Sequence, residues 1–307
     1  GPIVRYTTVA EEIDERHESV SEFSAGAVRF LFGLGKKMLL ANAVARIADA
    51  AFAAVMPSVL FAWLGAVAYT FQIYFDFSAY SDMAIGLGRM FGFHFLENFN
   101  YPYVARSVTE FWRRWHISLS TWFRDYVYIP LGGNRCSRAR NVWNLFVVWF
   151  LTGMWHGASW NFIAWGLWFF VLLVGEKLLW GKALERLPSL VRHAYAMVLV
   201  VFSWVLFRAE TLTAAAAYFA AMFGSSGVWC GSRVVYYALE FWPELLCCCI
   251  AALPVKQWLE TALQKRDAAP ARAVLTWGPK LAAMALLACS YCKLVTGSFN
   301  PFIYFRF

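Results

Sequence analysis

The stretch NVWNLFVVWFLTGMWHGASWNFIAWGLWFFVLLVG, residues 141–175, decides the fold because it contains no Lys, Arg, Asp or Glu. As one helix, at about 1.5 Å per residue, these 35 residues would extend for about 52 Å. The apolar core of a bilayer is only about 30 Å thick. The run is therefore too long for one membrane span and too short for two full spans joined by a turn.

The residues on either side of this run indicate how it is placed in a membrane. Basic residues flank it at both ends: Arg135, Arg138 and Arg140 before it, and Lys177, Lys182 and Arg186 after it. Because positive flanks usually face the cytoplasm, the chain is expected to enter the membrane, turn and return. Residues 141–155 reach only about 22 Å as a helix, so the turn at 155–159 is predicted to lie inside the membrane. Irregular backbone at that depth must be buried in protein or line a wet cavity.

The composition supports a membrane protein. Hydrophobic residues make up 61% of the chain and charged residues 15%, which excludes an ordinary soluble domain with about 25% charged residues. The net charge of +8 arises from basic residues in loops between apolar runs. The positive-inside rule explains this pattern. The expected partner is therefore a lipid bilayer, and binding to nucleic acid is not expected. The chain has seven Cys, three of them consecutive at 247–249, and their spacing does not resemble that of a zinc site. We therefore expect the cysteines to be thiols in the protein core, and we expect no metal site.

The other apolar runs predict an all-α, polytopic integral membrane protein with a single domain over residues 1–307. Residues 86–104 and 256–272 are expected to be loops. Residues 211–232 carry no charge and fit either a short span or a re-entrant piece. Spans are predicted at 57–75, 159–175, 190–207, 234–255 and 273–292.

Two acids, Asp76 and Asp82, follow the predicted span at 57–75 with no sign of a loop. A carboxylate at the bilayer centre costs about 2.5–3.5 kcal/mol on insertion scales, so these groups are expected to face protein, water or a cation. Two roles fit these acids equally well. They could belong to a buried polar network that holds helices together, or they could form the polar wall of a substrate path.

The stretch EFWRRWHISLSTWFR, residues 110–124, has helical periodicity. It predicts one helix on which Glu110 pairs with Arg114 one turn later. Its polar face would consist of Arg113, His116, Ser120 and Arg124.

Three segments resemble the membrane-bound O-acyltransferase family, and in particular its alginate O-acetyltransferase branch: FDFSAYSDMAIGLGRMFGF (75–93), FWRRWHISLSTWFRDYVYIPLGGNR (111–135) and TGMWHG (152–157). The opening GPIVRY and the closing PFIYFRF are similar to the same branch. The resemblance implies a multi-helix bundle with re-entrant segments around a central tunnel. Because family members usually begin with several more membrane helices, it also implies the C-terminal three-fifths of a longer enzyme.

The resemblance places the nearly universal family histidine on the WHG motif, hence at His156, and a second important histidine at His116. His156 would act as the general base, with Trp155 beside it and Gly157 leaving room for substrate. A histidine in an apolar helix is, however, more often structural, and Ser120 is only a supporting residue. Arg113 and Arg114 would either contact the phosphates of coenzyme A or serve as positive-inside anchors, and the second role is favoured.

The resemblance also implies the substrates. Acetyl-CoA, or a carrier charged from it, would be the donor on the cytoplasmic side of the inner membrane, with no bound cofactor. The acetyl group would reach a polysaccharide on the periplasmic side, through acetyl-accepting periplasmic partners. Alginate, cellulose and peptidoglycan all remain open, as does D-alanyl transfer. A non-enzymatic channel or transporter would also explain intramembrane acids, but it would require a relay of acids along several helices.

Overall fold

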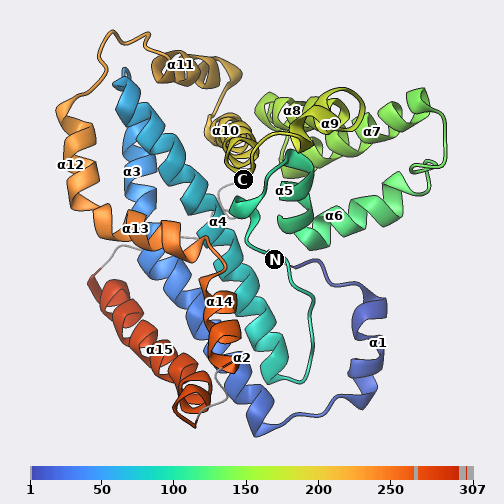
Figure 1. The fold of residues 1–307 in the computed structure, drawn as a ribbon, viewed down its shortest axis with the longest axis vertical. Helices are drawn as coiled ribbons and strands as arrows, with labels where there is room; N and C mark the ends of the chain where they lie inside the picture. Colours follow the sequence, from blue (N-terminus) through green and yellow to red (C-terminus); the bar gives the residue numbers. More distant parts are fainter. Residues whose placement is uncertain (1, 266–268, 297–301, 303–307) are drawn as a thin grey trace. The chain divides into compact units, whose positions relative to one another are not determined.

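The computed structural model describes residues 2–265, 269–296 and 302, and none of these residues lies in a β-strand (Figure 1). The closing PFIYFRF lies outside the described residues apart from Phe302. The helices are α1 (Tyr6–Glu15), α2 (Val20–Gly35), α3 (Asn42–Phe52), α4 (Val59–Met90), α5 (Val108–Arg114), α6 (Ile117–Phe123), α7 (Arg138–His156), α8 (Trp160–Gly175), α9 (Gly181–Glu185), α10 (Ser189–Arg208), α11 (Leu212–Met222), α12 (Ser232–Glu240), α13 (Trp242–Ala251), α14 (Val255–Gln264) and α15 (Ala269–Thr296).

Four of the described helical segments are long and apolar enough to cross a membrane, which confirms a polytopic all-α protein. They are α4, α8 with its continuation to Glu185, α10 and α15. The span predicted at 234–255 is interrupted at Phe241, between α12 and α13. Pro243 lies in the first turn of α13, where its missing N–H and fixed φ favour the start of a new helix.

Residues 211–232 form a short helix and a returning loop. With 11 residues, α11 is about 16 Å long, too short to cross a bilayer. The loop after it then reaches the N-terminus of α4, where the N–H groups of Val59 and Leu60 donate to the carbonyls of Val228 and Trp229, both at 3.0 Å. This segment therefore satisfies two backbone donors that the first turn of α4 leaves unpaired.

The loop predicted at 86–104 is confirmed for residues 91–101, whereas the loop predicted at 256–272 is largely helical among its described residues. Helix α4 continues to Met90 through Gly86 and Gly88, and α14 occupies much of 256–272. A side chain at Gly86 would place its Cβ 2.7 Å from the carbonyl oxygen of Gly26 in α2. The glycine thus permits close helix packing, and its presence in the sequence does not mark a turn.

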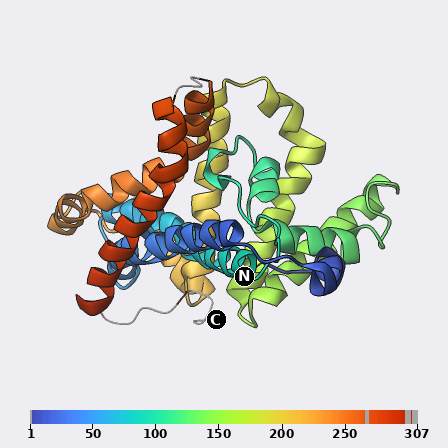
Figure 2. The same ribbon diagram turned by 90° about the horizontal axis from the view of Figure 1, so that it is seen from below.

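The chain forms two compact units. The first comprises residues 1–44, 71–99 and 241–306, and the second comprises residues 45–70 and 100–240. In the first unit, α2 packs along α15, whose unbroken length is visible in Figure 2. Gly33 of α2 faces the carbonyl of Ala79 in α4, which a Cβ would approach to 2.8 Å. Small residues therefore bring the helices of this unit together, as is common in membranes.

The second unit is built around the pair α7 and α8, which lie side by side in Figure 1. Helices α5 and α10 pack against α8, and their aromatic side chains form the core of the unit. The largest of these, Trp165 of α8 and Trp204 of α10, are each 1% exposed, and their ring centroids lie 6.2 Å apart. This aromatic core surrounds the end of α7 that carries His156.

Candidate active site

The uncharged run 141–175 folds back on itself. Helix α7 ends at His156, residues 157–159 form the turn, and the hydroxyl of Ser159 accepts a hydrogen bond from the Asn161 N–H at the start of α8. The two ends of the run meet, because Lys177 Nζ donates to Asn141 Oδ1 at 2.7 Å. The predicted helical hairpin is confirmed; the side of the membrane that its ends face stays a prediction.

Glycines bring the two legs of this hairpin into backbone contact. A Cβ at Gly153 of α7 would lie 2.5 Å from the carbonyl oxygen of Phe162, and one at Gly166 of α8 would lie 2.3 Å from that of Trp149. Both distances are far below an ordinary carbon–oxygen contact. The crossing therefore requires glycine at both positions, and it fixes the end of α7 relative to α8.

His156 is half-buried and is surrounded by aromatic rings. Its ring centroid lies 4.9 Å from those of Trp155 and Trp165, and 5.1 Å from that of Phe207. The planes of these three rings are nearly perpendicular to the imidazole. Neither imidazole nitrogen hydrogen-bonds to another described residue, and neither is sealed from solvent. This environment holds the imidazole in place and leaves its nitrogens able to bind a substrate group.

Gly157 lies at the turn of the hairpin, directly after His156. Its φ of +155° and ψ of 171° favour glycine, as expected for a tight turn. A Cβ at this position would lie 2.8 Å from Cε2 of Phe162. The missing side chain of Gly157 thus makes room for the Phe162 ring, and its expected role of leaving room for substrate stays a prediction.

The single helix predicted for residues 110–124 is broken at His116. Helix α5 ends at Arg114 and α6 begins at Ile117, while His116 adopts φ 43° and ψ 55°, in the left-handed region. The break lets Trp115 enter the aromatic core, with its ring centroid 4.9 Å from that of Trp204. A left-handed non-glycine residue costs about 1–2 kcal/mol, which burial of Trp115 at this point can offset.

Because of this break, the predicted polar face does not form. His116 is 2% exposed, and its Nδ1 lies 3.4 Å from the hydroxyl of Ser118. Ser120 lies one turn later, where its N–H donates to the His116 carbonyl at 3.0 Å. Arg113 is exposed on α5, and Arg124 pairs with Asp125 at 2.6 Å. The structure thus separates the buried His116 from the arginines with which the sequence pattern groups it.

Trp155 links the two histidines. Its ring centroid lies 4.9 Å from that of His156 and 6.1 Å from that of His116. The indole itself is 47% exposed, so it covers the two imidazoles from the outside of the aromatic core. Two predicted site histidines from separate segments therefore share one neighbour.

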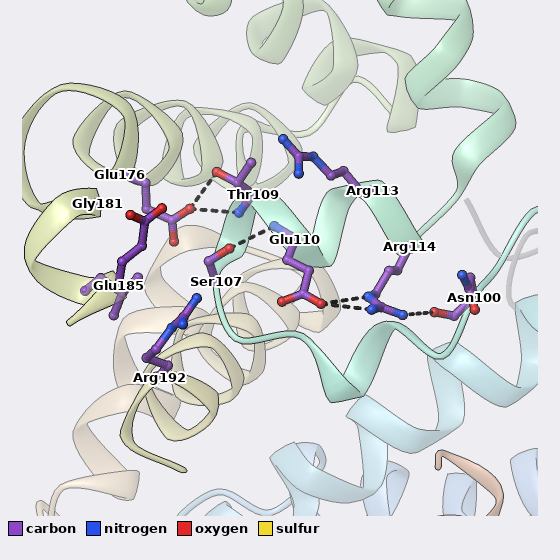
Figure 3. Close-up of a pocket in the computed structure, with 11 residues that line it drawn as sticks. Asn100, Ser107, Thr109, Glu110, Arg113, Arg114, Glu176, Gly181, Glu185 and Arg192 are labelled. Carbon is purple, nitrogen blue, oxygen red and sulfur yellow. Dashed lines mark hydrogen bonds and ion pairs between the residues drawn. The ribbon is translucent and has the colours of Figure 1, made fainter. Parts of the chain in front are cut away.

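A polar pocket of about 580 Å³ lies beside α5 (Figure 3). Glu110 and Arg114 form the predicted pair at 2.9 Å, and Arg114 also donates to the Asn100 carbonyl at 3.1 Å. Burial raises the pKa of Glu110, but hydrogen bonds from the Arg106 N–H and the Arg114 guanidinium keep the pKa below its ordinary value. Glu110 is therefore ionised and neutralises Arg114.

The two predicted arginines differ in this pocket. Arg113 makes no side-chain hydrogen bond or ion pair with any described residue, and in Figure 3 its guanidinium points away from the Glu110–Arg114 pair. The pocket is further lined by Ser107, Thr109, Glu176, Gly181, Leu184, Glu185 and Arg192. An unpaired guanidinium beside hydroxyl groups is a suitable contact for an anionic ligand.

Glu176 is a site residue that the sequence analysis missed. Its carboxylate accepts hydrogen bonds from the Val108 N–H at 2.7 Å, the Thr109 N–H at 2.8 Å and the Thr109 hydroxyl at 2.6 Å. It thus caps the N-terminus of α5 from the π-helical turn Glu176–Trp180 that continues α8. The only signal in the sequence is its position as the first acid after the uncharged run.

Asp76 and Asp82 lie in the first unit, in α4. Asp76 is buried in an ion pair with Lys37, while Asp82 pairs with Arg29 at 2.9 Å and with Lys36 at 2.6 Å. Arg29 also contacts Glu97 at 2.5 Å. Each carboxylate therefore has a cation beside it. This pairing is the arrangement expected of a network that holds α2 and α4 together.

The cysteine prediction holds for one residue of the triplet. Cys248 is buried, whereas Cys247 and Cys249 are exposed on other sides of α13. All seven thiols are free. Among the described residues, no three His, Cys, Asp or Glu side chains are placed to hold a metal ion.

Comparison with known proteins places this site in a family. The profile of the membrane-bound O-acyltransferase family matches residues 1–216, which include the hairpin and both histidines. The chain belongs to that family. It is a multi-pass membrane acyltransferase, and the resemblance noted in its WHG motif is confirmed over most of the chain.

Relatives with named activities span several acceptors. The probable alginate O-acetylase of Azotobacter vinelandii is 41% identical over all of this chain and 67% of its own length. The peptidoglycan O-acetyltransferase of Helicobacter pylori is 37% identical over 74% of this chain and 45% of its own length. The teichoic acid D-alanyltransferase of Bacillus subtilis is 33% identical over 45% of this chain and 38% of its own length. The names of these three relatives have in common the transfer of an acyl group, acetyl or D-alanyl, to a polymer.

Proposed function

We propose that this O-acyltransferase moves an acetyl group from acetyl-CoA on the cytoplasmic side of the inner membrane to hydroxyl groups of an exported polysaccharide such as alginate. The observation that carries the proposal is the state of His156. Its ring is held by aromatic neighbours at an irregular turn, and its nitrogens bind no described residue. A neutral imidazole with a free nitrogen is suited to be a general base.

In this reaction, His156 accepts the proton of the acceptor hydroxyl as the hydroxyl oxygen attacks the thioester carbonyl. A C–O bond forms, the C–S bond breaks, and the imidazolium returns its proton to the leaving thiolate. The aromatic surroundings of His156 include no acid, so the ring is neutral at the start of the cycle. An ionised carboxylate beside the base would instead favour the imidazolium, which cannot accept a proton.

We place the phosphate groups of the donor in the polar pocket beside α5, with Arg113 as their contact. Arg114 is less suited because Glu110 neutralises it. The opposite end of α5 is capped by Glu176, so the helix that carries Arg113 has a fixed position in the second unit. This assignment favours donor binding over membrane anchoring for Arg113 and anchoring or a structural role for Arg114.

The acceptor is proposed from the relatives. Names of relatives that match the whole chain indicate alginate, whereas those that match shorter parts of it indicate peptidoglycan and teichoic acid. Transfer through periplasmic acetyl-accepting partners is consistent with a base located in a membrane-embedded hairpin.

The test is to reconstitute the full-length protein in vesicles with acetyl-CoA labelled in its acetyl group. The proposal predicts label in alginate or in a co-reconstituted periplasmic partner, and none when His156 is replaced by Gln. Label that appears only with a D-alanyl thioester would contradict the acetyl donor. A flux of ions or protons through wild-type vesicles without acyl transfer would favour a channel.

A further inference from the structure

Three buried tryptophans of the second unit have indole N–H groups without acceptors. The Nε1 atoms of Trp112, Trp165 and Trp204 are sealed from solvent and have no hydrogen-bond partner among the described residues. The side chains are 9%, 1% and 1% exposed, respectively. By contrast, Trp63, Trp168 and Trp180 donate to Met222, Leu199 and Tyr195 at 3.0, 3.3 and 2.8 Å.

An unpaired buried donor has a free-energy cost. Leaving such a group without a partner costs about 1–3 kcal/mol, and native proteins pair most buried polar groups. The three indoles lie in one aromatic cluster, with the Trp165 centroid 5.8 Å from that of Trp112 and 6.2 Å from that of Trp204. The three unpaired donors therefore lie in the same aromatic core, and they differ in what their rings contact.

Of the three, Trp165 is the one whose ring is packed against His156. The two centroids lie 4.9 Å apart, with the ring planes at 84°. Of the three unpaired donors, the indole of Trp165 is therefore the one in direct contact with the proposed base. Indole is a donor only, so its partner must be an acceptor such as a carbonyl oxygen.

We propose that the Nε1–H of Trp165 donates a hydrogen bond to the carbonyl oxygen of the transferring acyl group while His156 accepts the proton of the acceptor hydroxyl. This inference rests on the proposed acyl transfer. As the hydroxyl oxygen attacks, negative charge develops on that carbonyl oxygen, and a fixed donor in a water-excluded site stabilises it most strongly at this point. No proton leaves the indole.

The sealed position of the Trp165 N–H agrees with this role. Water is excluded from the donor, so the hydrogen bond forms in surroundings of low dielectric constant, where it is strongest. Catalytic hydrogen bonds are often incomplete without substrate and tighten when the substrate binds. Entry of the acyl group requires a rotation of the aromatic rings that pack around the Trp165 indole, among them Trp112, Phe169 and Phe207.

The experiment replaces single tryptophans of the full-length enzyme with 3-benzothienylalanine, which keeps the bicyclic shape and has sulfur in place of the N–H. The matched control is the same replacement at Trp204, which is equally buried and has an unpaired N–H, and whose ring is next to Trp165. Initial rates of acetyl transfer and binding of acetyl-CoA are measured for both variants and for wild type.

We expect kcat to fall by about 10²–10³-fold at position 165, the usual effect of removing one oxyanion donor, with acetyl-CoA binding within twofold of wild type. The variant at position 204 should retain kcat within a few-fold. Wild-type kcat at position 165, equal losses at 165 and 204, or a loss confined to binding would each overturn the role of Trp165. If the wild-type enzyme transfers no acetyl group, the proposed function is wrong. If the wild-type enzyme transfers it and the replacement at position 165 has no effect on kcat, only the role of Trp165 is wrong.

Discussion

Replacing Gly166 by Ala tests whether the contact between α7 and α8 positions the catalytic base. The new Cβ would lie 2.3 Å from the carbonyl oxygen of Trp149 and 3.3 Å from the backbone of Gly153. An ordinary contact begins near 3.4 Å, so the two helices must separate by about 1 Å. The obstructing atom is backbone and cannot rotate away, which means that the end of α7 and His156 move with it.

The magnitude follows from two opposing effects. Overpacking of this kind costs about 1–3 kcal/mol, while Gly to Ala inside a helix contributes up to about 1 kcal/mol of stability. We expect Gly166→Ala to lower the free energy of unfolding by about 1–2 kcal/mol. Acetyl transfer should fall further, by about 10²-fold, because a displacement of about 1 Å at a catalytic group has an effect of that size.

The assay combines thermal unfolding in detergent with initial rates of acetyl transfer, and Gly278→Ala in α15 is the matched control. A Cβ at Gly278 would lie 3.7 Å from Cγ1 of Val274, an ordinary contact, so this variant should be as stable as wild type or more so, and as active. Wild-type stability and rate in Gly166→Ala would refute the packing argument. Equal losses in both variants would attribute the effect to helical glycine in general.

Three further substitutions separate binding, catalysis and folding. Asp76→Asn leaves Lys37 buried beside a neutral group and should lower the free energy of unfolding by about 3–5 kcal/mol, measured as detergent stability; unchanged stability would exclude a locking role. Arg113→Ala should raise the KM for acetyl-CoA about tenfold with unchanged stability, whereas Arg114→Ala should not; equal KM values for the two would contradict the pocket assignment. His116→Ala should raise the KM for acetyl-CoA more than it lowers protein yield, and an unaltered KM with poor folding would make His116 structural.

The hairpin could be predicted from the sequence because it depends on length and charge. An uncharged run of 35 residues between basic flanks has few ways to satisfy its backbone in a bilayer. The glycines at 86 and 88 led to an error for a related reason. Gly86 admits the backbone of α2, and Gly88 makes room for the ring of Phe95, which a Cβ would approach to 2.4 Å. Neither contact leaves a trace in local propensity.

The site was predictable where a family motif or a helical spacing indicated it. The family motif located His156 and His116, yet the periodic pattern around His116 concealed a break, because burial of Trp115 outweighs local helical preference. The four-residue spacing of Glu110 and Arg114 predicted that ion pair, but the sequence could not show that Arg113 lines the same pocket without a side-chain partner among the described residues. Glu176 accepts a hydrogen bond from the N–H of Thr109, which lies 67 residues earlier in the chain. Local sequence patterns give no information about contacts at that separation.

The role of His156 is the central claim, and His156→Gln tests it most directly. Glutamine keeps a polar side chain of similar length but cannot accept a proton near neutral pH. The variant is purified at full length and assayed for acetyl transfer and acetyl-CoA binding in the same preparation. We predict a loss of about 10²–10⁴-fold in rate with donor binding and folding intact, since general-base assistance contributes that much. Transfer at near wild-type rate would show that His156 is structural and would move the catalytic assignment to His116.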